Sequence, residues 1–260
     1  MNIDFCKYQG TGNDFILIDN RSNIFANISS TQINLLCDRR FGIGADGLIL
    51  LNSHSNYDFE MHYFNSNGKE ASMCGNGGRC IVSFAKKIGI INNSTKFIAV
   101  DGTHQAEVDE FENVKLKMQN VNKIEFGKNY YYLDTGSPHY VCFVKNIENF
   151  DVYKKGFKIR HNKRFREKGT NVDFVEIMEN SIFVRTYERG VENETLSCGT
   201  GVIASAISFS LLSKLNNNEY FITTKGGDLK VFLNKNKNRT FDNIWIEGPA
   251  KLVFTGNIKI

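Results

Sequence analysis

Short apolar runs recur along much of the chain, each about the length of one strand. They include FILID (15–19), LILL (48–51), FIAVD (97–101), YVCFV (140–144), DFVEI (173–177), LKVFL (229–233) and IWIEG (244–248). Short runs of this kind, rich in β-branched and aromatic side chains and bounded by polar residues, are typical of strands. The pattern therefore predicts a strand-rich chain with few helices.

Two segments favour helices instead, RCIVSFAKK (79–87) and VIASAISFSLL (202–212). Each follows a strand-like run, a glycine-bearing polar turn and a cysteine. The second segment is apolar or small on nearly every face, which suits a helix that is enclosed by a sheet. We predict that each helix threads through its own half of the chain.

The chain contains an internal repeat. YFNSNGKEASMCGNG (63–77) aligns without a gap with YERGVENETLSCGTG (187–201), 124 positions later. At the same offset Phe97, Ile98 and Gly102 match Phe221, Ile222 and Gly226, where each segment is predicted to be a strand that runs into a turn. A second echo pairs GTGNDFILI (10–18) with GTNVDFVEI (169–177) at a different offset, which insertions would explain. These matches predict two similar halves that meet near residue 120, where strand-like VKLKM gives way to polar QNVNK.

Composition and charge narrow the class of protein. The chain is 41% hydrophobic and 23% charged, as in soluble globular proteins. Its longest nearly apolar stretch, 202–212, is too short to span a membrane, and its first residues do not form a secretory signal, so we expect a cytoplasmic protein without a membrane partner. The net charge is +4, and the one basic run, 154–168, is typical of a solvated face, so nucleic-acid binding is not expected.

Six cysteines and five histidines give no metal-binding pattern. In a reducing compartment the cysteines are expected to be free thiols rather than disulfides. Cys74 and Cys80 are six positions apart, not in a C-x-x-C pair, and the histidines form no H-x-x-x-H group. We therefore predict no structural zinc or other metal.

Two of the cysteines occupy matching positions in the repeat. Cys74 precedes Gly75 and Gly77, and Cys198 precedes Gly199 and Gly201, each at a predicted helix start. The positive end of a helix dipole favours a thiolate, and uncovered N–H groups there bind anions. A single such cysteine would be interpreted as a buried structural residue, but the repetition favours a functional pair.

This pair has the components needed to invert a carbon centre. One thiolate would remove an α-proton, the opposite thiol would deliver another, and the two helix N-termini would hold the carboxylate and stabilise the carbanion. We recognise no lysine motif for pyridoxal phosphate and predict no cofactor. Redox chemistry between the cysteines is the rival interpretation, but it leaves the paired anion-binding turns unexplained.

Three other features have competing interpretations. GIGADG (42–47) matches a dinucleotide motif, but it follows a polar segment and leads into a strand, so we predict a turn before a strand. Glu188 and Arg189 end the strand before Cys198, either as a surface ion pair or as groups that bind an ammonium and a carboxylate. His139 is either a structural hydrogen-bonding residue or a group that adjusts a thiolate.

The whole chain resembles the diaminopimelate epimerase family. The blocks that carry the resemblance, in the family's order, are GTGNDFILID, CDRRFGIGADG, FNSNGKEASMCGNGGRC, TGSPHYV, GTNVDF, VRTYERGVENETLSCGTG, GGDLKV and IEGPAKLVFTG. The resemblance implies an α/β (α+β) fold of two pseudo-symmetric domains, each a curved mixed or antiparallel sheet wrapped around a central helix. We assign 1–120, joined by the C-terminal strand 251–260, to one domain and 121–250 to the other.

The resemblance also implies an activity, the interconversion of LL- and meso-2,6-diaminopimelate in lysine and peptidoglycan-precursor synthesis. It makes Cys74 and Cys198 the two bases, and it implies a homodimer in many members. The matching positions for the reacting carboxylate are Gly75, Asn76, Gly199 and Thr200; those for the rest of the substrate are Asn13, Asn65, Asn171, Glu188 and Arg189; and those that adjust the cysteine pKa values are His139 and Glu188.

Two positions depart from the family pattern. Ser137 stands where many members have Asn, so an amide contact to the distal end of the substrate would be lost. Gly47 stands where some members have a glutamine that contacts substrate. The alternatives to this activity are a proline or hydroxyproline racemase of the same fold, a binding protein without catalysis, and an isomerase that uses no thiols. Arg189 and the two retained cysteines argue against them.

Overall fold

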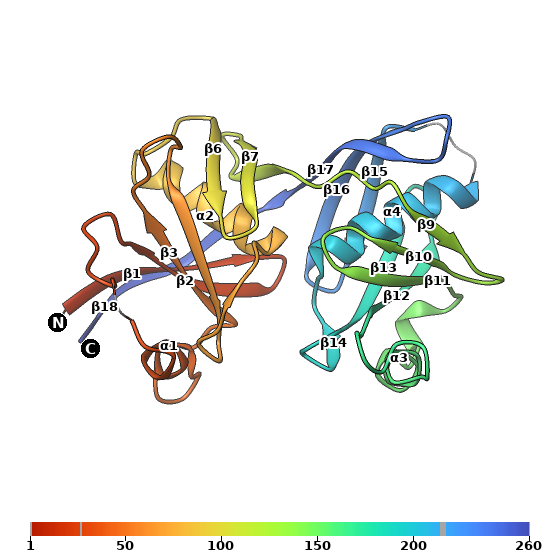
Figure 1. Cartoon of the computed structure of the whole chain (residues 1–260), viewed down its shortest axis with the longest axis horizontal. Coiled ribbons are helices and arrows are strands. Elements are labelled where there is room, and N and C mark those ends of the chain that lie inside the picture. Colours follow the sequence, from red (N-terminus) through yellow and green to blue (C-terminus); the bar gives the residue numbers. More distant parts are fainter. Residues whose placement is uncertain (1, 27, 214–216, 260) are drawn as a thin grey trace. The chain divides into compact units, whose positions relative to one another are not determined.

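The computed structural model describes residues 2–26, 28–213 and 217–259. These residues form two compact units, one running up to Leu116 and resuming at Gly248, the other comprising Lys117–Glu247. Figure 1 follows the chain through both units in sequence colours.

The first unit is a mixed sheet around one helix. Its sheet follows the order β18–β1–β2–β3–β4–β6–β7–β8, with the short β5 on β4; only β2–β3 and β4–β6 are parallel. The elements are β1 (Asn2–Gly10), β2 (Asn13–Asp19), α1 (Ser30–Cys37), β3 (Gly47–Asn52), β4 (Glu60–Asn65), β5 (Glu70–Ala71), α2 (Gly75–Lys87), β6 (Ser94–Ala99), β7 (Gly102–Val108), β8 (Asn113–Lys117) and β18 (Lys251–Lys259).

The second unit repeats this order as β9–β10–β11–β12–β13–β15–β16–β17, with β14 on β13, and again only two pairs, β11–β12 and β13–β15, are parallel. The elements are β9 (Ile124–Phe126), β10 (Tyr131–Asp134), β11 (Pro138–Phe143), η1 (Ile147–Asn149), α3 (Val152–Arg160), β12 (Asn171–Ile177), β13 (Ile182–Glu188), β14 (Asn193–Thr195), α4 (Gly199–Ser213), β15 (Glu219–Thr224), β16 (Gly227–Lys235) and β17 (Phe241–Pro249).

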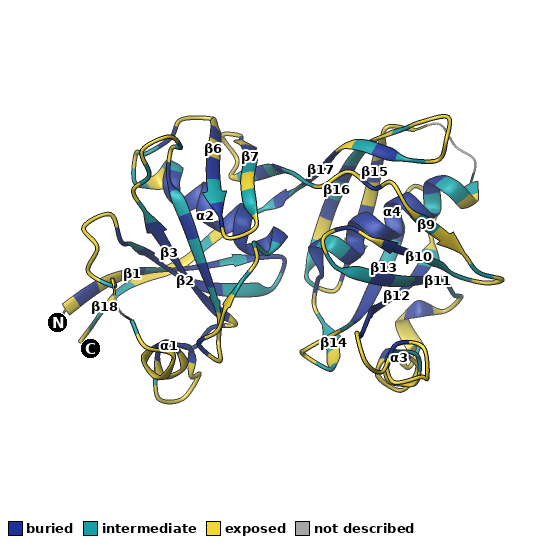
Figure 2. Ribbon diagram, viewed as in Figure 1, coloured by how far each residue is buried: buried dark blue, intermediate teal, exposed yellow. Residues whose placement is uncertain are grey.

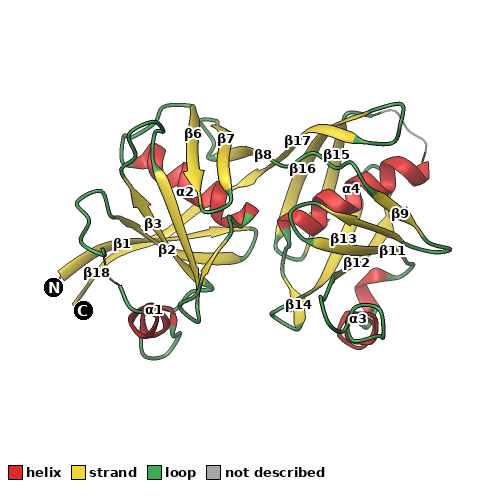
Figure 3. Cartoon of the chain, in the orientation of Figure 1, coloured by secondary structure: helices red, strands yellow, loops and turns green. Residues whose placement is uncertain are grey.

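The two long helices are the enclosed elements of their units. Every residue of α2 from Gly75 to Ala85 is buried, and α2 contacts β1, β2, β3 and β7 (Figure 2). In the second unit α4 contacts β10, β11, β12, β13, β15 and β16 (Figure 3), and most of its residues are buried (Figure 2). Because α4 is surrounded, apolar or small residues on all its faces are required. The predicted fold class is confirmed.

The strand order shows which strands of the two units are equivalent, and it differs from the pairing given by the second sequence echo. The echo pairs β2 with β12, but β12 lies between a parallel neighbour, β11, and an antiparallel neighbour, β13. In the first unit β3 has this environment, between parallel β2 and antiparallel β4. The counterpart of β12 is therefore β3, and the echo was wrong because both GT-containing turns precede buried strands of similar composition.

The glycine-rich segment 42–47 forms a turn that leads into β3, as predicted. Gly44 has φ of 80°, a conformation that favours glycine, and β3 begins at Gly47. At Gly42 a Cβ would lie 1.9 Å from the Leu35 carbonyl oxygen, so a side chain there is excluded. Within the part of the chain that is described, no helix is long and apolar enough to cross a membrane.

Candidate active site

Cys74 lies at the N-terminus of α2, as predicted. It is the N-cap residue, and its carbonyl accepts the first helical hydrogen bond from Gly78 N at 2.7 Å. Its half-buried thiol donates to Asn13 Oδ1 at 3.7 Å, and Asn76 Nδ2 donates to the same oxygen at 3.3 Å. The start of β2 and the first turn of α2 therefore bring Cys74, Asn13 and Asn76 together.

A charged network holds Asn13. Its Nδ2 donates to Asp46 Oδ2 at 2.6 Å, and Arg39 bridges Asp46 and Asp14 at 2.8 and 2.7 Å. Burial would raise the pKa of Asp14, but hydrogen bonds from Arg39 and Lys7 outweigh it and hold that pKa well below its usual range. Asp14 therefore stays ionised at neutral pH. It holds the start of β2 next to the turn at residues 11–13, which we call the Asn13 turn.

Asn65 ends β4 near a position that must be glycine. Asn65 Oδ1 accepts from Tyr63 Oη at 2.8 Å, and Asn65 pairs with Gly47 across β3 and β4. A Cβ on Gly47 would lie 2.5 Å from the Phe64 carbonyl oxygen and 2.6 Å from the Tyr63 ring. A glutamine at position 47 would thus require β4 to move, which explains this departure from the family pattern.

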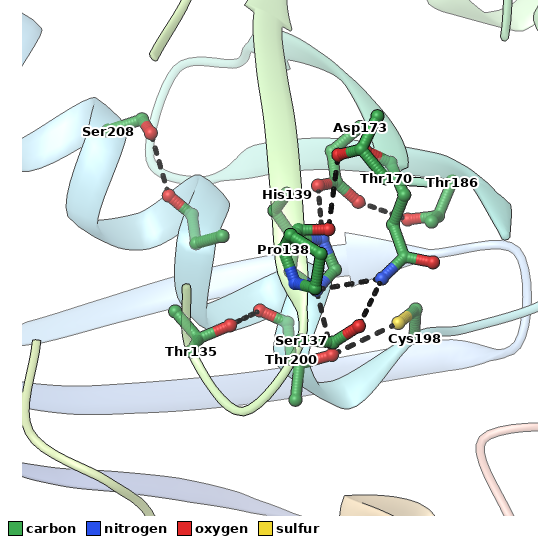
Figure 4. Close-up of polar contacts among 12 residues, drawn as sticks. Thr135, Ser137, Pro138, His139, Thr170, Asp173, Thr186, Cys198, Thr200 and Ser208 are labelled. Carbon is green, nitrogen blue, oxygen red and sulfur yellow. Dashed lines mark hydrogen bonds and ion pairs between the residues drawn. The ribbon is translucent and has the colours of Figure 1, made fainter. Parts of the chain in front are cut away.

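Cys198 directly precedes α4, and its carbonyl accepts from Val202 N at 2.9 Å. Its Sγ lies 3.5 Å from Thr200 Oγ1, which is 2.8 Å from His139 Nε2. His139 Nδ1 is 2.7 Å from Asp173 Oδ2, and both of these side chains are fully buried. Figure 4 shows this chain of polar contacts from Cys198 to Asp173.

Hydrogen bonding determines the tautomer of His139. The Arg189 backbone N–H donates to Asn171 Oδ1 at 2.8 Å, which turns Asn171 Nδ2 toward His139 Nε2 at 3.3 Å. Since Nδ2 can only donate, Nε2 is the unprotonated acceptor, and the ring proton on Nδ1 donates to Asp173. Nε2 is thus available to accept a proton through Thr200.

The helix N-terminus alone does not make Cys198 a thiolate, contrary to the prediction from helix position. Burial raises the pKa of Cys198 well above its usual value, and the charges of Glu188 and Asp173 raise it further. The contact with the Thr200 hydroxyl and the hydrogen bond from the Gly201 N–H oppose this effect but are weaker. Cys198 is therefore a thiol at neutral pH in this structure.

Gly201 is required by packing. A Cβ there would lie 2.4 Å from Asp173 Oδ1 and 3.2 Å from His139 Cε1. The matching Gly77 of the first unit has a looser environment, where a Cβ would lie 3.1 Å from the Ile49 Cδ1 methyl. The second glycine of each turn thus lets buried side chains approach the helix start, in addition to uncovering the helical N–H groups.

Ser137 connects two residues that the family resemblance assigns to substrate binding. Its Oγ accepts from Asn171 Nδ2 at 3.0 Å and from Arg189 Nη2 at 3.3 Å. Arg189 Nη1 also donates to the Lys168 carbonyl at 3.1 Å, and Arg189 is exposed just beyond β13, where Glu188 is the last residue. The shorter Ser137 therefore orients Asn171 and Arg189 through its hydroxyl.

Sequence reasoning did not single out two buried charged residues beside the cysteines. Asp173 is fully buried in β12 and holds both His139 and, through Oδ1, Thr186 at 2.7 Å. Arg79 is fully buried in α2. In the sequence, Asp173 stands between the apolar residues Val172 and Phe174 of a strand, and Arg79 stands among the small residues of a helix start. Ionisable residues in such surroundings are buried only with a specific role.

The fold defines a class of protein. A phenazine biosynthesis protein of the PhzF family from Bacillus anthracis superposes with a TM-score of 0.77 over 100% of both chains at 15% identity. A probable proline racemase from Agrobacterium radiobacter superposes with a TM-score of 0.70 over 99% of this chain and 93% of its own at 14% identity. The chain thus has the two-unit fold that these proteins share.

Sequence comparison specifies the family within this fold. The diaminopimelate epimerase family model matches residues 5–124 and 131–253. A diaminopimelate epimerase of Flavobacterium psychrophilum is 52% identical over 97% of this chain and 98% of its own, and one of Chlorobaculum tepidum is 43% identical over 96% and 99%. The chain belongs to the diaminopimelate epimerase family, which confirms the resemblance.

Proposed function

We propose that this chain interconverts LL- and meso-2,6-diaminopimelate without a cofactor, with Cys74 and Cys198 as the acid/base pair. The main support is that each of two matching helices begins directly after a cysteine. In addition, relatives that match this chain over nearly their full length are named diaminopimelate epimerases. The product would enter lysine and peptidoglycan-precursor synthesis.

In the proposed reaction, one cysteine thiolate removes the α-proton and the other cysteine thiol donates a proton to the opposite face of the same carbon. The electron pair of the broken C–H bond passes into the carboxylate as an enediolate and returns to form the new C–H bond. The N–H groups of Gly75, Asn76, Gly199 and Thr200 hold that carboxylate and offset the developing charge. After turnover the two cysteines have exchanged protonation states.

The rest of the substrate is assigned to five polar residues: Asn13, Asn65, Asn171, Glu188 and Arg189. Arg189 provides an exposed guanidinium that can bind a second carboxylate bidentately, and Glu188 can accept from an ammonium. Proline and hydroxyproline have no second carboxylate and would leave Arg189 without an anion. This cation therefore favours diaminopimelate over those substrates.

His139 and Glu188 adjust the reactivity of Cys198 in this proposal. The thiol proton can pass through Thr200 Oγ1 to His139 Nε2, which is poised as an acceptor, while Asp173 stabilises the resulting imidazolium. Glu188 favours the protonated thiol by its negative charge. We further propose that the enzyme works in the cytoplasm as a homodimer.

The decisive experiment is incubation of the reduced protein with LL-diaminopimelate in D₂O, followed by NMR of meso product and α-deuterium. We expect meso product that carries deuterium at the inverted carbon. L-Proline and trans-4-hydroxy-L-proline in parallel incubations should remain unchanged. Absence of exchange with diaminopimelate would overturn the proposed activity, and turnover of a proline substrate would reassign the chain to the racemase alternative.

A further inference from the structure

Arg79 is a buried cation that lacks a carboxylate partner. Its side chain is fully buried in α2, and within the described ranges no ion pair involves it. Its Nη2 donates to Thr11 Oγ1 at 3.1 Å and its Nη1 to the Gly75 carbonyl at 3.3 Å, while Nε has no hydrogen-bond partner in this part of the chain. A buried charge is costly unless an anion compensates it.

The nearby thiols are the groups that can supply the anion. Burial lowers the pKa of Arg79, and negative charge on Cys80 or Cys74 would oppose that shift. Cys80 is itself fully buried, which raises its pKa to about 12, so it remains a thiol at neutral pH. Cys74 is only half-buried, so a charge on its thiol costs less desolvation than a charge on Cys80.

The other titratable side chains on the strands that contact α2 do not supply the anion for Arg79. They are Asp4, Cys6, Lys7 and Tyr8 on β1, Asp14 and Asp19 on β2, and His104 and Glu107 on β7, and β3 has none. None of them is among the groups that shift the pKa of Arg79, which are Cys80 and Cys74 besides burial. The one carboxylate among them that influences Cys80 is Asp14, and it is engaged by Lys7 and Arg39.

The second unit shows that the scaffold does not need an arginine here. At the repeat offset that relates Cys74 to Cys198, the counterpart of Arg79 is Ile203, which is fully buried in α4. A helix in this position therefore packs with an apolar side chain. The charge at position 79 is specific to the Cys74 half of the molecule.

We infer that Arg79 is a positioning residue for Cys74: its buried positive charge stabilises the Cys74 thiolate, and its bonds to Thr11 and Gly75 hold the Asn13 turn against the helix start. This role rests on the proposed function, in which one cysteine is ionised and the other protonated. Arg79 makes Cys74 the ionised member, while the carboxylates around Cys198 make that cysteine the protonated one. Cys74 is then already the base when substrate binds.

The test compares Arg79→Gln, which removes the charge, with Arg79→Lys, which retains it. Iodoacetamide alkylation of Cys74 is followed against pH by peptide mass spectrometry, with Cys198 in the same digest as internal control. We expect Arg79→Gln to move the Cys74 curve to higher pH and to slow alkylation at neutral pH by about tenfold, the effect of one pH unit in thiolate fraction. Arg79→Lys should keep the curve near that of the wild type, and the Cys198 curve should not move.

A purely structural role gives a different result. If Arg79→Gln leaves the Cys74 curve in place, or if Gln and Lys move it equally, the inference is wrong. If Arg79→Gln loses its cooperative thermal unfolding, Arg79→Met, which mimics Ile203, is the neutral variant to compare with Arg79→Lys. Alkylation needs no substrate, so this result stands apart from any failure of diaminopimelate turnover.

The pH profile of kcat/KM provides the second readout. With the charge removed, the acid limb should move to higher pH, and activity should approach that of the wild type where Cys74 ionises without help. A loss of activity that is the same at every pH would indicate misplacement of the Asn13 turn and would contradict the charge effect.

Discussion

The two cysteine sites share a backbone but differ in charge. Each cysteine precedes a buried helix of the same topology, and each is followed by glycines at matching positions. The buried Arg79 lies on the helix that follows Cys74, whereas the charges of Glu188 and Asp173 act on Cys198 and Thr200 connects it to His139. The repeat has thus preserved the geometry of a helix N-terminus, and the surrounding side chains have made the two thiols different.

This difference matters for the proposed reaction, in which one cysteine accepts a proton and the other donates one. If both helix N-termini produced thiolates, neither cysteine could donate a proton, and two thiols would leave no base. A cation near one thiol and carboxylates near the other define one ionised and one protonated group before substrate arrives. The repeated motif provides the two cysteines, and the different charged residues near each one favour a thiolate at Cys74 and a thiol at Cys198.

The largest expected effect comes from removing either thiol. Cys74→Ala and Cys198→Ala should each lower epimerisation by about 10³-fold or more, because each removes one of the two proton-transfer groups. Conversion of LL-diaminopimelate to the meso form, followed by NMR, measures the loss. Near-normal turnover by either variant would show that two bases are not needed.

The glycines that follow the cysteines test the packing difference between the sites. Gly201→Ala should lower stability by about 1–3 kcal/mol because the new Cβ must displace Asp173 Oδ1 from its position 2.4 Å away. A shift of the His139–Asp173 pair should also reduce kcat about 10²-fold.

Gly77→Ala is the matched control for that variant. The end of the flexible Ile49 side chain, 3.1 Å from the new Cβ, can move, and alanine favours the helix by about 1 kcal/mol over glycine. Its thermal unfolding should therefore remain near that of the wild type. Equal losses of thermal stability in Gly201→Ala and Gly77→Ala would show that packing does not differ between the two sites.

The carboxylates near Cys198 have an effect of definite sign. The charge of Glu188 raises the pKa of Cys198, so Glu188→Gln should lower that pKa and increase the thiolate fraction at a given pH. Alkylation of Cys198 at mildly alkaline pH should accelerate by about three- to tenfold. The Cys74 curve should stay in place, and Glu247→Gln, which removes a carboxylate paired with Lys230 on the second sheet, is the control. Slower alkylation of Cys198 would contradict the assigned charge effect.

The smallest effect is expected at Ser137. Ser137→Ala removes the hydroxyl that accepts from Arg189 and Asn171, which should raise KM for diaminopimelate about two- to tenfold, the value of one hydrogen bond. The kcat should change little because the Ser137 hydroxyl bonds to Asn171 and Arg189, whereas Cys198 contacts Thr200. A fall in kcat with constant KM would assign Ser137 to the chemical step instead.

Much of the fold and part of the site could be predicted from local sequence. Strand-forming runs, the enclosed helix at 202–212 and the turn at 42–47 follow from residue patterns because periodicity and glycine content act over short distances. The ungapped repeat singled out Cys74 and Cys198 from six cysteines, and the family blocks pointed to the family that the comparisons confirm. Their helix positions also followed, since a helix N-terminus is a local feature.

Only the tertiary structure decided which strands correspond between the units and what surrounds each thiol. The strand order replaced β2 by β3 as the counterpart of β12, because strand pairing joins residues far apart in the sequence. The contacts of Cys198 with Thr200, and through it with His139 and Asp173, likewise come from three separate segments. Ionisation depends on burial and on charges within a few ångströms, and the order of residues along a chain does not contain those distances.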